Sequence, residues 1–120
     1  MNGIVIITPE NTVEVRRVER SLELSELQEI VGGYIETAGT IFGPDTMIGD
    51  DTVMVVNEEG KILGLPENEM ATGLHDVPWD PIVGTAVICG VDGEELVPLP
   101  LEVVDEITRR WLEVTPWDGE

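Results

Sequence analysis

The chain contains one cysteine and one histidine, Cys89 and His75, the pair of residue types needed for a thiol nucleophile and its general base. Cys89 lies in the apolar run VICG, where a thiol behaves as a small hydrophobic group and burial raises its pKa. His75 precedes Asp76 in a segment that we expect to be a loop. We therefore predict no catalytic Cys–His pair. The serines Ser21 and Ser25 also lack a nucleophile-elbow motif.

Carboxylate pairs occur at Asp50-Asp51 and Glu58-Glu59, but their spacing does not match a calcium-binding loop. A structural zinc site takes about four cysteine, histidine or carboxylate ligands, and one cysteine and one histidine are too few. We expect these carboxylates to be solvated turn residues. The residues thus predict no metal, no cofactor and a protein that is not an enzyme.

The charge balance is strongly acidic, with 25 aspartates and glutamates against 6 lysines and arginines, a net charge of −19. A field of this sign repels nucleic acids and anionic membranes and attracts basic surfaces. Three explanations are open: a surface selected for solubility, adaptation to high salt, and imitation of DNA towards a DNA-binding protein. We expect a basic protein partner, with no direct nucleic-acid or membrane contact.

Three tryptophans stand out beside one phenylalanine and one tyrosine. We expect Trp111 to be in the core, whereas Trp79 and Trp117 lie beside prolines and aspartates. A rigid aromatic side chain among carboxylates is a candidate hot spot for a basic partner, although packing of its loop onto the sheet would explain Trp79 equally well. Trp117 also fits a frayed tail. The candidate partner-binding residues are Trp79, Asp76, Asp80, Glu58 and Glu59.

Three of the six cationic residues lie within five positions, at Arg16, Arg17 and Arg20. Arginines near a helix start are typical of anion sites, so these residues with Tyr34 form a candidate nucleotide-binding set. A homo-oligomer would favour such a site, because subunit boundaries build pockets from few residues each. The alternative is ion pairing within the chain, for which the sequence offers Glu14, Glu19 and Glu23.

The elements that must position these residues begin with two strands, at 3–7 and 12–19, in a hairpin. A helix over 25–33 follows, with Ser25 and Gln28 at capping-box spacing and a glycine pair at its end. Residues 34–42 are expected to be extended.

Further strands are predicted at 52–56, 61–65 and 82–91, the first two joined by a turn at 57–60. Asn68 is expected to cap a short helical piece, and a final helix starts at Pro100. The predicted fold is α+β: a mainly antiparallel sheet of about five to six strands, one short central helix and a C-terminal helix. Residues 1–114 form one domain and 115–120 an acidic tail.

Three stretches carry a further signal: LQEIVGGYIE at 27–36, NEEGKILGLPEN at 57–68 and DPIVGTAVICG at 80–90. Through them the chain resembles an uncharacterised domain-of-unknown-function family of phages, plasmids and some bacteria and archaea. The resemblance covers residues 1–98 and fits least well at 43–51 and in the final helix. It brings no catalytic residues. It implies a small accessory protein of a mobile element, a class that commonly binds something of its host.

Together these signals predict a phage or mobile-element accessory protein that binds a host factor stoichiometrically, in counter-defence or host takeover, as an acidic decoy or DNA mimic. The alternatives are a homo-oligomeric sponge for a nucleotide immune signal and a halophile-adapted domain. We expect a location in the host cytoplasm. Three observations support it: no run of about 18 apolar residues, a first segment that reads as a strand and not as a secretory signal, and a single cysteine.

Overall fold

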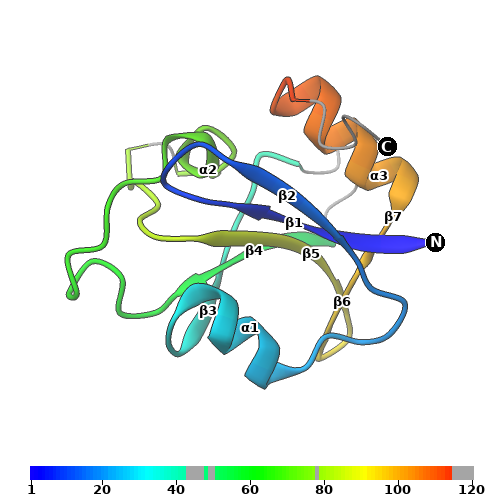
Figure 1. Ribbon diagram of the computed structural model, residues 1–120, viewed down its shortest axis with the longest axis horizontal. Coiled ribbons are helices and arrows are strands. Elements are labelled where there is room, and N and C mark those ends of the chain that lie inside the picture. Colours follow the sequence, from blue (N-terminus) through cyan, green and yellow to red (C-terminus); the bar gives the residue numbers. More distant parts are fainter. Residues whose placement is uncertain (43–47, 49–50, 78, 115–120) are drawn as a thin grey trace.

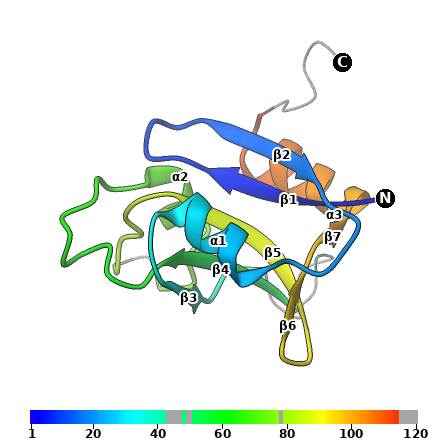
Figure 2. The same ribbon diagram turned by 60° about the horizontal axis from the view of Figure 1, so that its bottom comes forward.

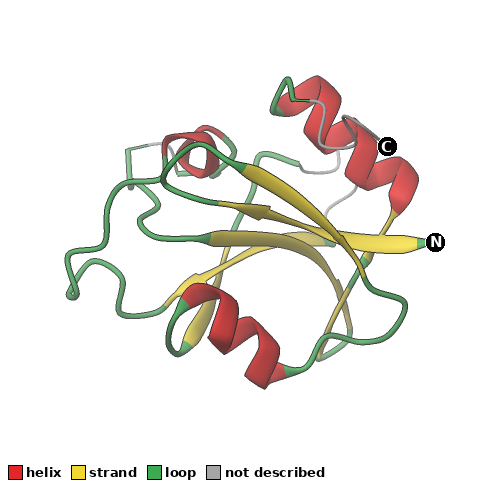
Figure 3. Cartoon of the chain, viewed as in Figure 1, coloured by secondary structure: helices red, strands yellow, loops and turns green. Residues whose placement is uncertain are grey.

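A twisted β-sheet forms the centre of the molecule and carries helices on both faces (Figures 1 and 3). The computed structural model describes residues 1–42, 48, 51–77 and 79–114. The strands are β1 (Asn2–Ile7), β2 (Val13–Arg17), β3 (Ile35–Ala38), β4 (Thr52–Asn57), β5 (Ala86–Asp92), β6 (Glu95–Val97) and β7 (Leu99–Pro100). The helices are α1 (Leu24–Val31), α2 (Glu69–Gly73), α3 (Leu101–Glu106) and a π-helical turn, η1 (Ile107–Trp111).

The strand order is β2-β1-β5-β4-β3, with β6 added to β5 and β7 added to β1. Every pairing among the described strands is antiparallel. The outermost strands of the main path are β2 and β3, and each pairs there with one neighbour. The predicted α+β class with a mainly antiparallel sheet and a C-terminal helix is therefore confirmed.

Two apolar layers sandwich the sheet, and the central strands are buried on both sides. In β1, Ile4 and Ile6 pack in the layer of α1, whereas Val5 and Ile7 pack in the layer of α2 and α3. Figure 2 shows α1 on one side of the sheet and α3 on the other. This two-sided burial explains why β1 and β5 appear in the sequence as continuous apolar runs rather than alternating ones.

The first helix starts one residue earlier than predicted and is capped by other residues. Glu23 is its N-cap, and Glu26 completes the capping box by accepting a hydrogen bond from the Glu23 N–H at 2.8 Å. The predicted pair Ser25 and Gln28 is therefore wrong, because the backbone is still extended at Glu23 and turns helical directly after it. The predicted glycine stop is confirmed, since Gly32 caps the C-terminus at φ +83°.

The predicted strand at 61–65 and its hairpin with β4 are wrong. Both edges of β4 are already paired, with β3 and with β5, so no edge is left for a third strand. Residues 58–64 instead form consecutive turns, in which Leu63 N–H donates to Glu59 O at 2.9 Å. Ile62 is consequently 84% exposed rather than part of the sheet.

The short helical piece expected after Asn68 is α2, so the described chain has one more helix than the predicted fold of one central and one C-terminal helix. Asn68 caps it as expected, with its side chain accepting a hydrogen bond from Ala71 N–H. The strand expected at 82–91 starts later, at Ala86, because Gly84 has a left-handed backbone with φ +75°. Pro100 is the N-cap of α3 and also ends β7.

Several predictions fall on residues outside the described part of the chain. They concern Trp117, the tail at 115–120, and most of the stretch 43–51, including Asp50. Among the helices that the structure does describe, none has the length and apolar character required to cross a membrane.

Candidate functional site

A pocket of about 360 Å³ opens on the side of the sheet that carries α2. Its walls come from residues 36–39 in and after β3, residues 56–58 at the end of β4, residues 61–62 of the following turn, and the segments 75–77 and 80–83. Core residues Val56 and Ile82 lie at its base. The charged side chains and the imidazole that line it are Glu36, Glu58, Lys61, His75, Asp76 and Asp80.

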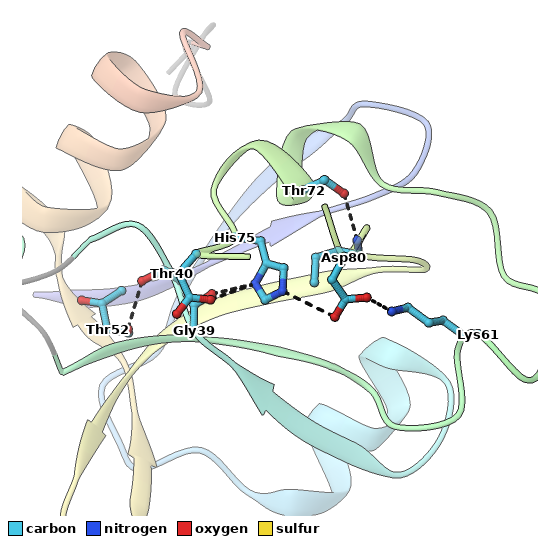
Figure 4. Close-up of polar contacts among 9 residues, drawn as sticks. Gly39, Thr40, Thr52, Lys61, Thr72, His75 and Asp80 are labelled. Atoms are coloured by element: carbon cyan, nitrogen blue, oxygen red, sulfur yellow. Dashed lines mark hydrogen bonds and ion pairs between the residues drawn. The ribbon is translucent and has the colours of Figure 1, made fainter. Parts of the chain in front are cut away.

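His75 is a buried polar group of this pocket, with only 6% of its surface exposed. Its Nδ1 lies 2.9 Å from the carbonyl oxygen of Gly39, and because a carbonyl only accepts, Nδ1 is the donor (Figure 4). The ring is therefore fixed with Nε2 turned towards Asp80, whose Oδ2 lies 4.0 Å away. Within the described residues, Nε2 makes no hydrogen bond.

Backbone pairing holds His75 in this position. The segment 74–76 lies antiparallel to the chain after β3, with a bridge between Thr40 and His75. Ile41 N–H donates to Leu74 O at 2.9 Å, and Asp76 N–H donates to Gly39 O at 3.3 Å. The imidazole is thus anchored at both its backbone and its Nδ1 atom, so the direction of Nε2 is set by the fold.

Asp80 connects the two loops at the mouth of the pocket. The Lys61 ammonium contacts Oδ1 of Asp80, while Oδ2 faces the imidazole (Figure 4). The hydrogen bond from Lys61 is the main reason why the pKa of Asp80 is lowered, and the positive charge of Lys61 acts in the same direction. Asp80 is therefore a carboxylate with one oxygen engaged and the other directed to the pocket interior.

The electrostatic character of the pocket is acidic. Four carboxylates, from Glu36, Glu58, Asp76 and Asp80, line it against the single ammonium of Lys61. Ionised carboxylates only accept hydrogen bonds, so the arrangement suits a cationic group that brings N–H donors. In the part of the chain that the structure describes, no three histidine, cysteine or carboxylate side chains converge to hold a metal ion.

The structure brings together most of the residues that the sequence suggested for partner binding. Asp76, Asp80 and Glu58 line the pocket, and Trp79 precedes Asp80 with 82% of its surface exposed. Packing of Trp79 onto the sheet, the alternative explanation, is not observed. Glu59 lies apart, in a smaller hollow beside Tyr34 and Leu63.

Sequence reasoning missed Glu36, Lys61 and His75 as members of this pocket. Lys61 carried one usable signal, since it is the single lysine of the chain and its charge must pair among many carboxylates. Glu36 and His75 carried none, because their places depend on how the segment 74–76 pairs beside β3.

The four residues proposed for nucleotide binding are not gathered into one site. Arg16 pairs with Glu14 at 3.1 Å, and Arg20 makes a bidentate pair with Glu26 at 2.7 and 3.1 Å. Arg16 and Arg17 are adjacent in β2 and therefore point to opposite faces. Tyr34 follows the C-terminal end of α1, whereas the Arg20–Glu26 pair lies at its N-terminal end.

Pairing of Arg16 with Glu14 agrees with the intrachain alternative, but Arg20 uses Glu26 rather than Glu19 or Glu23. Glu19 accepts a hydrogen bond from the Asn2 backbone instead, and Glu23 is occupied as the N-cap of α1.

Cys89 and His75 lie on opposite sides of the sheet. Cys89 is fully buried in the layer of α1, and this burial raises its pKa to about 12. His75 faces the pocket on the α2 side. A thiol so placed is held in its unreactive protonated form at neutral pH.

Buried asparagines link the sequence motifs to one another. The Nδ2 of Asn57 donates to the Val31 carbonyl at 3.2 Å, and its Oδ1 accepts from Glu59 N–H at 2.8 Å. A Cβ on Gly33 would lie only 2.9 Å from the Asn57 amide nitrogen, so the absence of a side chain at Gly33 leaves room for the Asn57 amide. The end of α1 and the turn after β4 are therefore joined by one side chain.

Asn68 links the other motif residues in the same way. Its Nδ2 donates to the carbonyls of Ile7 and Gly84, both at 2.9 Å, and the residue is completely buried. Leu65 packs against Gly84, where a Cβ would meet its Cδ1 at 2.8 Å. The stretches at 57–68 and 80–90 thus act mainly as structural joints that build the pocket walls.

A protein-family model described as Domain of unknown function (DUF3846) matches residues 1–112. The chain belongs to this family. The match confirms the expected membership of an uncharacterised family, and it extends through the final helix, beyond the residues 1–98 on which the resemblance was based. A search of curated proteins and a search of solved structures each returned no match. The function of this DUF3846 chain must therefore be argued from its own geometry.

Proposed function

We propose that this DUF3846 chain is a stoichiometric binding protein whose acidic pocket receives a cationic side chain of a basic protein partner. The observation that carries the proposal is the pair of acceptors inside the pocket. His75 Nε2 and Asp80 Oδ2 face each other at 4.0 Å, which is beyond hydrogen-bond distance, so the two atoms are not bonded to each other.

An arginine side chain suits this arrangement best. In the neutral imidazole, Nδ1 keeps its proton for Gly39, so Nε2 is left as an acceptor beside a second acceptor. A guanidinium group presents several N–H donors in a fixed plane and can serve both acceptors at once. Lys61 contacts only the other oxygen of Asp80, so the Lys61–Asp80 ion pair can persist when the guanidinium group binds.

The charge of the whole chain supports the same type of partner. A net charge of −19 attracts a basic surface over several ångströms and raises its rate of encounter. Trp79, exposed next to Asp80, adds an aromatic surface on which a guanidinium group can also stack.

The biological setting of the proposal comes from the family resemblance. We propose an accessory protein of a phage or another mobile element, acting in the host cytoplasm by occupying a basic surface of a host factor, as in counter-defence. An acidic decoy that replaces DNA on a nucleic-acid-binding protein is one form of this proposal. The protein acts by occupancy and needs no turnover.

Titration with a fluorescein-labelled arginine decapeptide tests the proposal, with fluorescence anisotropy as the measurement. Asp80→Asn should weaken binding about tenfold, because it removes the charge and replaces one of the two carboxylate oxygens with an NH2 group, which only donates. Glu102→Gln is the matched control, since Glu102 is an exposed carboxylate of α3 outside the pocket. We expect this control to change affinity by less than about twofold.

Binding should also weaken steeply between about 50 and about 300 mM NaCl, since part of the attraction is long-range. Equal losses for Asp80→Asn and Glu102→Gln would show that the peptide senses only net charge, and the pocket would then not be the binding site.

A further inference from the structure

We propose that the partner segment binds as an extended strand added to the outer edge of β3, which no described strand pairs with, and that its cationic side chain enters the pocket. This inference rests on the proposed function and deepens it. It specifies the backbone conformation of the ligand and the protein edge that recognises it.

The pairing of β3 with β4 defines which backbone groups face outwards. Glu58 N–H donates to Tyr34 O at 2.8 Å, which marks residues 34 and 58 as a hydrogen-bonded pair. Such pairs alternate along an antiparallel ladder, so Glu36 and Ala38 turn their backbone groups towards β4. Ile35 and Thr37 therefore present their N–H and C=O groups at the outer edge.

The same outer edge is already paired one step further along the chain. Gly39 O and Ile41 N–H, which also face outwards, are bonded to Asp76 N–H and Leu74 O. After Asp76 the chain turns away, with Asp80 N–H donating to Val77 O at 2.9 Å. Residues 74–76 thus pair with the chain directly after β3, but this pairing does not continue along β3 itself. Ile35 and Thr37 have no partner on this edge among the described residues.

The pleat directs an added strand at the pocket. Glu36 lines the pocket, and Ala38 packs in the core layer on the same face of β3. A new strand would lie about 4.8 Å from β3, and every second side chain would share the row of Glu36 and Ala38. A long cationic side chain in that row points towards Asp80.

The two outermost strands of the sheet differ in how they discourage such pairing. Strand β2 carries three charged residues among its five, Glu14, Arg16 and Arg17, and edge charges oppose strand addition. Strand β3 carries one among its four, Glu36, and this carboxylate belongs to the pocket. The edge next to the pocket is therefore the one less protected by charge.

Charge also decides the occupant in favour of a basic partner over a second copy of this chain. Two copies would bring two net charges of −19 together at an edge already bordered by Glu36, Glu58 and Asp76. A basic strand instead neutralises those carboxylates while it completes the backbone pairing.

The experiment uses the full-length chain and an acetylated, amidated hexapeptide of alternating arginine and valine. Two controls have the same sequence and charge, one N-methylated at every arginine amide and the other at every valine amide. Only one row of amides faces the protein in an added strand, so one control should lose at least about tenfold in affinity while the other keeps most of it.

Amide hydrogen exchange gives the structural readout. Ile35 and Thr37 amides should exchange rapidly in the free protein and slowly in the complex, whereas Glu36 and Ala38 amides should be protected in both. Thr37→Pro removes an outward donor without touching the ladder to β4 and should abolish binding. Thr37→Val, the matched variant, keeps the N–H and should bind within about twofold.

Each outcome supports or overturns the inference. Equal binding of all three peptides would overturn it while leaving the proposed pocket function intact, and no binding of any peptide would remove both. Dimerisation of the free chain through the β3 edge would also overturn it, in favour of a second copy. If Thr37→Pro fails to fold, the exchange rates of Ile35 and Thr37 in the wild-type complex decide the question.

Discussion

Asp80 illustrates how much a single side chain contributes in this molecule. One of its oxygens contacts Lys61 and so joins two loops, and the other faces the imidazole of His75. The two roles come from one carboxylate, because its oxygens point in different directions. Asp80 is therefore both a structural link and the acceptor on which the proposed recognition of a cation depends.

Glu26 has a comparable double role away from the pocket, and its charge should be visible in the pH dependence of stability. The hydrogen bond from Arg20 lowers its pKa from 4.5 to about 2, and the Glu23 backbone adds to the shift. Because the folded-state pKa is lowered, the stabilisation is present above pH 4.5 and is lost as the pH falls towards 2.

The matched variant is Glu26→Gln, which removes the charge but keeps an acceptor for the Glu23 N–H. We expect it to lower the free energy of unfolding by about 0.5–1 kcal/mol near pH 6, a small effect because the ion pair is exposed to solvent. Urea titrations near pH 6 and pH 2.5 measure the difference. An equally large difference at both pH values would contradict the assignment.

At the scale of elements, the pocket walls depend on tight joints between segments that are distant in sequence. Gly84 is one of these joints, because its carbonyl accepts a hydrogen bond from Asn68 and the side chain of Leu65 packs against it. Its backbone is left-handed, with φ +75°. Gly32 has a similar backbone, φ +83°, but no atom near the position of a Cβ. An alanine at Gly32 would therefore meet backbone strain alone, whereas an alanine at Gly84 would meet backbone strain and a steric clash.

We predict that Gly32→Ala destabilises the fold by about 1 kcal/mol through backbone strain alone. Gly84→Ala should cost about 2 kcal/mol, since its Cβ also meets the Leu65 side chain. Chemical unfolding of both variants measures these costs. A double-mutant cycle with Leu65→Ala should recover the difference, and strictly additive losses would show that Leu65 is not the obstacle.

At the scale of the whole molecule, the charge of −19 opposes compaction. Raising NaCl from about 20 to about 500 mM should therefore increase the melting temperature, by about 5 °C, as screening weakens the repulsion. Tetramethylammonium chloride at equal ionic strength is the control and should act alike. A melting temperature that does not rise with either salt would contradict net repulsion, whereas unfolding in the low-salt buffer would support the halophilic explanation.

Features of single residues and short segments were predicted from the sequence better than the pairing of distant segments. The buried runs of β1 and β5, the glycine end of α1 and the cap at Asn68 were predictable because each depends on neighbouring residues. The strand expected at 61–65 failed for a non-local reason. A short apolar run is compatible with a strand, but both edges of β4 were taken by strands from elsewhere in the chain.

The candidate site divides in the same way. Asp76, Asp80 and Glu58 were proposed from composition and neighbourhood, and the pocket does contain them. Glu36 and His75 were missed, because they reach it only through pairing of residues 74–76 beside the end of β3.

The sequence by itself determined the net charge, the identity of the single thiol and imidazole, and the runs that must be buried, since these are properties of residues or of short segments. Only the tertiary structure decided that carboxylates from four segments share one pocket, that His75 directs Nε2 into it, and that β3 has no second strand partner among the described residues. The physical reason is that these features require backbone groups far apart in the chain to pair, and local preferences do not specify which distant segments meet.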